Sequence, residues 1–257
     1  MPVHRPDHML RMPTHLWPYP RWIAHRGAGK LAPENTLAAF RLGAAHGYRM
    51  FECDVKLSAD GVPFLLHDAT LERTTNGTGI AGQQPWHVLS QLDAGAWHSP
   101  RFSGEPLPTL ADVAQTCLAQ GWMLNIEIKP TPGLGAETGA AVAQAAQALW
   151  ANAPVAPLLT SFDPASLSAA QSVAPNLPRG LLVHENWEGA VDTARELACT
   201  ALVCHHALWT ATAVQQARGA GLRTLAYTVN DAPTADRLWA WGLDGLITDQ
   251  VHEFSPV

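Results

Sequence analysis

The sequence predicts a single (β/α)₈ barrel, and three observations support this prediction. The chain has 257 residues, a length that suits one large domain of this class. Short apolar runs typical of buried strands recur along it, and segments with helical periodicity separate most of them. No glycine-rich dinucleotide fingerprint follows the first predicted strand, which disfavours the alternative, a doubly wound sheet. We expect one domain over residues 1–257, with an irregular arm over 1–20 and a loop-rich insertion over 69–108.

The first part of the chain predicts a strand, a helix and a β-hairpin. Asn35 or Thr36 is expected to cap the helix, because a short polar side chain can accept a hydrogen bond from the first helical turn. Gly47 is expected to end the helix, and Ala59, Asp60 and Gly61 form the hairpin turn. The elements are expected at residues 21–25, 37–46, 50–57 and 62–66.

The insertion over residues 69–108 interrupts this succession of strands and helices, because it is rich in glycine, threonine and proline. A loop of this length inside a compact domain is usually functional, often as a lid or a specificity element. After it, a helix precedes each strand. Helices are expected at 110–120, 136–150, 164–173, 188–197, 210–220 and 232–241, and strands at 123–128, 156–161, 179–183, 201–204, 222–229 and 245–248. With the strands at 21–25 and 50–57, this gives the eight strands of a barrel.

The composition of the chain disfavours a nucleic-acid-binding or membrane-spanning protein and a role for the cysteines in metal binding. A net charge of −6 argues against a nucleic-acid partner. The sequence has no apolar signal core at its start and no apolar run long enough to span a membrane, so we expect a cytoplasmic protein without stable membrane association. The four cysteines lack metal-site spacing and are expected to be buried reduced thiols. The oligomeric state cannot be predicted from the sequence.

Three carboxylates near strand ends predict a metal site. Glu52 and Asp54 lie two residues apart in a strand, so their side chains point to the same face. Acids on the inner face of an apolar strand need a positive partner, and Glu127 at the end of the next barrel strand adds a third carboxylate. Oxygen ligands without cysteine suit one divalent cation, Mg²⁺ or Ca²⁺, and are also compatible with Mn²⁺.

Basic and imidazole groups at the same rim predict an anionic, oxygen-rich substrate. Arg26 offers a planar fork suited to phosphate, and Lys129 could contact phosphate or pair with Glu127. His25 and His67 could serve as general base and general acid on either side of a phosphodiester, since both forms of an imidazole exist near neutral pH.

Each of these groups also has a structural explanation when it is taken alone. His67 and Asp68 could form a hydrogen-bonded pair, Glu52 and Asp54 could belong to a charged edge strand, and Glu127 and Lys129 could form an ion pair at a strand end. The combination of all these groups, and not any one of them, predicts a site. Turn or capping roles are expected for Asp244 and Asp249, rather than metal binding. Structural roles are expected for His205 and His206, with lining of the barrel mouth as the alternative.

In order and spacing, five motifs resemble the glycerophosphodiester phosphodiesterase family, and the resemblance covers roughly residues 21–250. Residues 71–79, 97–110, 228–230 and 245–249 also resemble that family. The leading motifs are His25-Arg26-Gly27, Pro33-Glu34-Asn35-Thr36, Glu52-x-Asp54, His67-Asp68 and Glu127-Ile128-Lys129.

The resemblance implies a barrel enzyme that uses a divalent metal to hydrolyse small-molecule glycerophosphodiesters to glycerol 3-phosphate and an alcohol. It further implies that Tyr227, where many relatives have tryptophan, packs over a glycerol moiety and alters the pocket on the alcohol side. The implied metal ligands are Glu52, Asp54 and Glu127, the acid–base pair is His25 and His67, and the phosphate contacts are Arg26 and Lys129.

For the mechanism, we expect a glycerol hydroxyl with a metal-lowered pKa to lose its proton to one histidine and attack phosphorus. The other histidine then protonates the leaving alcohol, and water opens the cyclic phosphate. The sequence favours His25 as base and His67 as acid only slightly. Direct attack by water, a phospholipase acting on lysophospholipids, and a non-catalytic phosphodiester-binding barrel are the alternatives.

Overall fold

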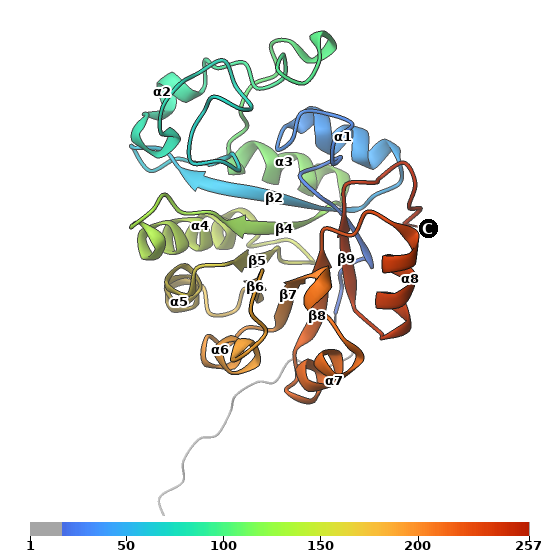
Figure 1. Ribbon diagram of the computed structural model, residues 1–257. Helices are drawn as coiled ribbons and strands as arrows, with labels where there is room; N and C mark the ends of the chain where they lie inside the picture. The colour runs from blue at the N-terminus through green and yellow to red at the C-terminus, as the bar shows by residue number, and fades with distance from the viewer. Residues whose placement is uncertain (1–16, 257) are drawn as a thin grey trace, which may run out of the picture.

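The computed structural model describes residues 17–256, which form a closed barrel of eight parallel strands ringed by helices (Figure 1). The strands of the ring are β1 (Trp22–Ala24), β2 (Met50–Leu57), β4 (Met123–Ile128), β5 (Leu158–Ser161), β6 (Arg179–Val183), β7 (Ala201–His205), β8 (Arg223–Tyr227) and β9 (Gly245–Thr248). They pair in the order β1-β9-β8-β7-β6-β5-β4-β2, and a β1–β2 pairing closes the ring. The predicted fold class is therefore confirmed.

One strand lies outside the ring, as the hairpin motif predicts. The strand β3 (Pro63–Leu65) pairs antiparallel with β2 and returns the chain to the rim where β2 ends. This hairpin explains how His67, which follows β3, reaches the side of the barrel where the other polar groups lie. The predicted arm over 1–20 falls mostly on residues 1–16, outside the described residues.

Most of the helices around the barrel begin where the sequence supplies a side-chain cap, whereas the helices that begin at Gly135 and Ala190 have none. Thr36 accepts a hydrogen bond from the backbone N–H of Ala39, and Thr109 and Asp112 form a capping box. Pro157 has no N–H to donate, and β5 begins after it rather than at residue 156 as predicted. The helices are α1 (Leu37–Ala45), α3 (Leu110–Gln120), α4 (Gly135–Leu149), α5 (Pro164–Val173), α6 (Ala190–Glu196), α7 (Ala211–Gly219) and α8 (Ala232–Ala240).

Residues 69–108 form the predicted insertion with little regular structure. It contains η1 (Ala81–Gln83), α2 (Trp86–Leu89) and η2 (Pro100–Phe102), and it lies beside β2 and α3 (Figure 1). Leu71, Leu89 and Leu107 pack with the β3 residue Phe64 into a small buried cluster. The insertion is therefore attached to the barrel by its own hydrophobic core.

An apolar layer lies beneath the polar residues of the barrel. Met50, Glu52 and Asp54 alternate along β2, so their side chains share its inner face, with Met50 nearest the start of the strand. Met50 belongs to a buried cluster with Ile23 and Leu158, drawn largely from strands. The acids therefore lie above a packed floor, near the carboxyl ends of the strands.

The predicted state of the cysteines is confirmed, because all four are buried and free. Within residues 17–256, no helix has both the length and the apolar composition needed to cross a membrane.

Candidate active site

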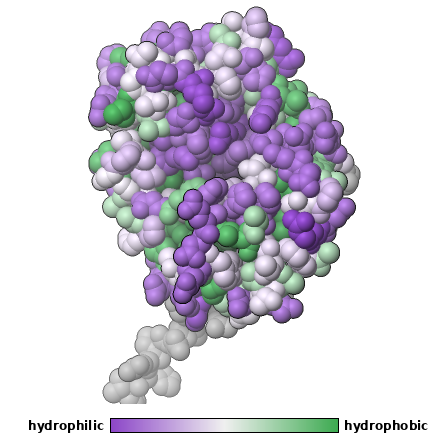
Figure 2. Space-filling model, viewed as in Figure 1, coloured by the Kyte–Doolittle hydropathy of each residue, from purple (hydrophilic) through white to green (hydrophobic). Residues whose placement is uncertain are grey.

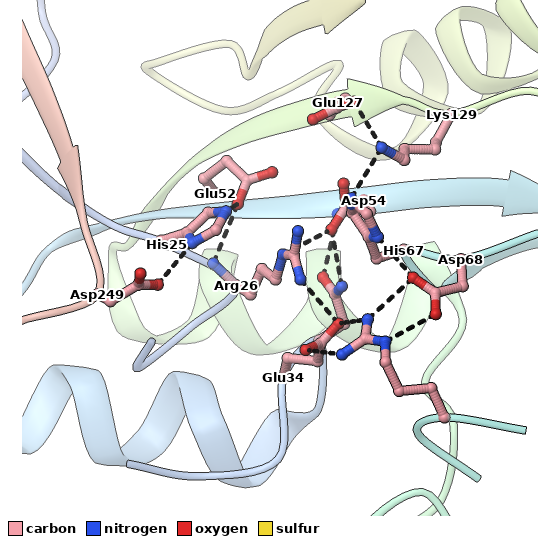
Figure 3. Close-up of polar contacts among 12 residues, drawn as sticks. His25, Arg26, Glu34, Glu52, Asp54, His67, Asp68, Glu127, Lys129 and Asp249 are labelled. Atoms are coloured by element: carbon pink, nitrogen blue, oxygen red, sulfur yellow. Dashed lines mark hydrogen bonds and ion pairs between the residues drawn. The ribbon is translucent and has the colours of Figure 1, made fainter. Parts of the chain in front are cut away.

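Charged side chains converge at the carboxyl ends of β1, β2 and β4. His25 and Arg26 directly follow β1, while Glu127 lies on β4 and Lys129 just beyond its end. In the close-up they point toward one another around Glu52 and Asp54 (Figure 3). The same face of the molecule is hydrophilic at its hollowed centre (Figure 2).

The structure brings the three predicted acids together. Oxygen atoms of Glu52, Asp54 and Glu127 lie within 4.8 Å of one another. The register explains this, because Asp54 is the direct neighbour of Glu127 across the β2–β4 pair. Side chains in register on one face of a parallel sheet cannot avoid each other without distorting the strands.

Burial and mutual repulsion set the protonation of these acids. Burial, with repulsion from Asp54 and Glu127, raises the pKa of Glu52 well above its usual value. Burial, with repulsion from Asp54, raises the pKa of Glu127 to about 8. Burial also acts to raise the pKa of Asp54, but the nearby charges of Arg26 and other groups outweigh it and hold the pKa below its usual value.

The three carboxylates suit a hard divalent cation. They supply oxygen atoms from two adjacent strands, and Glu52 and Asp54 are almost fully buried, at 4% and 1% exposed. The pKa values of Glu52 and Glu127 are both raised, which means that the nearby positive charges do not fully offset the burial and mutual repulsion of these carboxylates. A cation bound among them would supply that charge.

His25 is held by a carboxylate on the last strand of the ring. Its Nδ1 lies 2.6 Å from Oδ1 of Asp249, and its Nε2 lies 3.8 Å from Oε2 of Glu52. Asn230 holds Asp249 in turn, donating from Nδ2 to Oδ2 at 2.8 Å. A Cβ at Gly29 would collide with the Asp249 backbone, so glycine permits this close approach.

The turn or capping role expected for Asp249 was therefore wrong. Residues 25 and 249 are at opposite ends of the described chain, and they meet because β1 pairs with β9 when the barrel closes. The resemblance included Asp249 in a motif, but spacing in the sequence gave it no partner. Asp244, for which a turn or capping role was also expected, has a structural role of another kind, because it binds Arg223 and the backbone N–H of Thr224 on the neighbouring strand.

His67 lies on the other side of the acids. Its Nδ1 is 2.8 Å from Oδ1 of Asp68, and its Nε2 is 2.9 Å from Nζ of Lys129. The ammonium group of Lys129 lies 3.4 Å from Oε1 of Glu127, so it joins the imidazole to the acidic cluster (Figure 3). Burial is the largest of the causes that lower the pKa of His67.

Arg26 adopts a conformation unusual for a residue with a side chain. Its φ is +52°, in the left-handed region, and its backbone N–H donates to Oε2 of Glu52 at 3.0 Å. Its guanidinium donates from Nη1 to Oε1 of Glu34 at 3.0 Å, and Nε lies 3.4 Å from Oδ2 of Asp54. Strain of this kind persists where surrounding contacts enforce it, and such positions cluster at functional sites.

Two residues that the sequence interpretation did not single out complete the charged network. Arg73 of the insertion forms ion pairs with both Glu34 and Asp68. Lys56 is almost fully buried on β2 and donates from Nζ to the backbone oxygen of Lys129 at 3.2 Å; burial lowers its pKa to about 8. Alternation along β2 places Lys56 on the face of Glu52 and Asp54, and this signal could have identified it.

The structure does not bring Tyr227 into the hydrogen-bonded network of acids and bases. Its hydroxyl donates to the backbone oxygen of Val183 at 3.1 Å and lies 3.1 Å from Nδ1 of His184. Phe162 lies between the two regions, because its ring centroid is 5.9 Å from that of Tyr227 and 6.0 Å from Nζ of Lys129. Tyr227 thus belongs to a group of rings at the ends of β5 to β8.

Comparisons with known proteins agree with this geometry. The family model for the glycerophosphoryl diester phosphodiesterase family matches residues 25–253. A glycerophosphodiester phosphodiesterase of Caldanaerobacter subterraneus is 32% identical over 235 residues, which cover 88% of this chain and 93% of that protein.

Solved structures support the same relationship. A phosphodiesterase of Oleispira antarctica, in complex with the product sn-glycerol-3-phosphate, is 35% identical with a TM-score of 0.83, and the match covers 90% of this chain and 93% of that one. A glycerophosphodiester phosphodiesterase of Agrobacterium tumefaciens is 28% identical with a TM-score of 0.77, over 93% of this chain and 100% of that one. The chain therefore belongs to the glycerophosphodiester phosphodiesterase family of enzymes, as its motifs predicted.

Proposed function

We propose that this chain hydrolyses glycerophosphodiesters to sn-glycerol 3-phosphate and an alcohol, using one divalent cation and two histidines. The observation that carries the proposal is the arrangement of three clustered carboxylates, two of them buried, with His25 on one side and His67 on the other. The product bound to the Oleispira antarctica phosphodiesterase supports this choice of substrate class.

The proposed cation is Mg²⁺ or Ca²⁺, with Mn²⁺ also compatible, and its ligands are Glu52, Asp54 and Glu127. The oxygen-only donor set supports a hard ion. When bound, such an ion supplies positive charge to a phosphate oxygen and to a glycerol hydroxyl, whose pKa it lowers. Arg26 and Lys129 add positive charge for the phosphate.

His25 and His67 move the protons. Each has a carboxylate at Nδ1, which leaves Nε2 for the substrate. The lowered pKa of His67 and the contact of its Nε2 with Lys129 favour an unprotonated Nε2, so we assign His67 as the base. Asp249 orients the imidazole of His25, which we assign as the acid. This order reverses the slight preference drawn from the sequence.

The proposal also concerns the alcohol part of the substrate, the domain organisation and the cellular location. Tyr227 lies with Phe162 and His205 at the part of the rim away from the acids, and we assign this group of rings to the part of the substrate beyond the phosphate. A single functional domain and a cytoplasmic location stay predictions from the sequence.

Glycerophosphocholine with Mg²⁺ or Ca²⁺ should yield glycerol 3-phosphate, measured with a coupled dehydrogenase. EDTA should abolish the release, and excess of the same cation should restore it, because the acids cannot bind phosphate without positive charge between them. Release that continues in EDTA would contradict the metal assignment. A failure to cleave any of several glycerophosphodiesters would contradict the proposed activity.

The cation-free protein should lose stability as the pH rises from 5 to 8. The pKa of Glu127 in the folded chain is about 8, above its unfolded value, so its contribution is fully present at low pH and is lost as the carboxyl ionises. Adding Ca²⁺ at about 100 times its Kd should raise the melting midpoint by about 5–10 °C at pH 8, and less at pH 5. Glu127→Gln should lose part of both effects, and the rest should stay because the pKa of Glu52 is raised as well; an unchanged response would contradict the assignment.

His25→Ala and His67→Ala should each lower kcat by about 10²- to 10⁴-fold, because each removes one proton-transfer group. Circular dichroism should show both variants folded. His252→Ala is the matched control, since His252 is exposed and pairs with Glu253 at the surface. A loss of less than about tenfold in either variant would contradict the two-histidine assignment.

A cyclic glycerol phosphate should form and decay during turnover if the glycerol hydroxyl attacks phosphorus. Rapid-quench samples of the wild type analysed by ³¹P NMR would detect it. Its absence from the wild-type time course would favour direct attack by water.

A further inference from the structure

Arg73 joins two carboxylates that lie just outside the proposed reaction centre. It donates from Nε to Oδ2 of Asp68 at 2.7 Å and from Nη2 to Oδ1 at 2.9 Å. It also donates from Nη1 to Oε2 of Glu34 at 2.9 Å and from Nη2 to Oε1 at 2.8 Å. A guanidinium can make two such bidentate pairs at once because its donors form a rigid planar fork.

Each of these carboxylates also holds a group of the proposed machinery. Asp68 uses Oδ1 to bind Nδ1 of His67 at 2.8 Å, and Glu34 uses Oε1 to bind Nη1 of Arg26 at 3.0 Å. The result is a continuous chain of contacts from the imidazole of His67 to the guanidinium of Arg26, whose labelled members are visible in Figure 3. Arg73 is its midpoint, and it comes from the insertion rather than from a barrel strand.

The chain of contacts determines which ring nitrogen of His67 carries the proton. Hydrogen bonding to Arg73 is the largest of the causes that hold the pKa of Asp68 far below its usual value, so Asp68 stays ionised and can only accept. Nδ1 of His67 must then donate to it, and Nε2 keeps the lone pair that faces Lys129. The tautomer of His67 therefore depends on Asp68 as well as on Lys129, and the orientation of Asp68 depends on Arg73.

We propose that Arg73 is a positioning residue that sets the orientation and tautomer of His67 through Asp68, and the orientation of Arg26 through Glu34. Its catalytic consequence rests on the proposed function. By this assignment the insertion helps to build the reaction centre, in addition to covering part of the barrel rim.

A purely structural role for Arg73 makes a different prediction. If Arg73 only connected the insertion to the barrel, its removal would lower activity only by lowering the stability of the folded protein. Its side chain is 45% exposed, however, and ion pairs at such positions contribute little to stability. The insertion is also anchored by its own buried cluster. Removing the guanidinium should therefore leave the melting midpoint nearly unchanged while it releases His67 and Arg26.

Arg73→Gln should lower kcat by about 10- to 100-fold and raise KM several-fold, since supporting residues around a site have effects of this size. Asp68→Asn should lower mainly kcat, and Glu34→Gln should raise mainly KM. The double variant of Arg73→Gln and Asp68→Asn should lose little more kcat than Asp68→Asn alone, because both act through one imidazole.

Two further variants separate geometry from charge. Arg73→Lys keeps the charge but lacks the fork, so it should recover only part of the loss. Arg101→Gln removes another arginine of the insertion, whose guanidinium lies over Phe102 and makes no ion pair within residues 17–256; it should keep wild-type kinetics. Melting midpoints measured for all variants would reveal any general loss of stability.

The tautomer gives a readout that does not depend on activity. In ¹⁵N spectra of the cation-free, full-length chain, assigned by comparison with His67→Gln, the wild-type ring should be protonated at Nδ1. Arg73→Gln should shift it toward the Nε2-protonated form that free imidazole side chains prefer. An unchanged tautomer, or a kcat within twofold of wild type, would overturn the proposal. If the wild type cleaved no glycerophosphodiester, the proposed function would fail, and the spectra would still decide whether Arg73 orients His67.

Discussion

The arrangement of the site depends on one electrostatic constraint: three carboxylates lie close together with little access to water, and their negative charge must be balanced. Glu52, Asp54 and Glu127 are held within 4.8 Å of one another by rigid strands, so they cannot separate to relieve their repulsion. Burial of unbalanced charge is costly, and the raised pKa values of Glu52 and Glu127 express that cost as a preference for the neutral form. The cations around the acids and the hydrogen bonds that orient those cations follow from this constraint.

The strands and the loops have different parts in meeting it. Strands of the barrel supply the acids, whose positions are fixed by register, while the segments that follow β1 and β3 supply the two imidazoles. Loop residues are less constrained than strand residues. Here the orientation of each imidazole is fixed by a carboxylate outside the cluster of three acids, Asp249 for His25 and Asp68 for His67. Loop groups can therefore reach the accuracy of strand groups when a charged hydrogen bond determines their orientation.

Local patterns in the sequence were sufficient to predict the fold and most of the site. The alternation along 50–57 and the short apolar runs after residue 108 identified the strands, because buried strands in parallel sheets have a distinctive composition. The pairing of His67 with Asp68 was predicted, but the partner of His25 and the arginine that holds Asp68 were not, and the reasons are physical. Asp249 meets His25 only when the ring closes, and Arg73 lies in an insertion whose sequence has no periodicity. Contacts of these kinds have no signal in local spacing.

The insertion follows β3, and its position explains why such a loop would be retained. The β2–β3 hairpin ends beside the acids, so any segment that continues from it begins at the proposed reaction centre. A short connection to α3 could carry His67, but it would have no room for a core of its own. The longer segment buries Leu71 and Leu89, which fixes its backbone firmly enough to hold a guanidinium against two carboxylates. Hydrophobic packing within the loop thus supports the electrostatic order of the site, because a mobile Arg73 would lose more entropy in making those bonds.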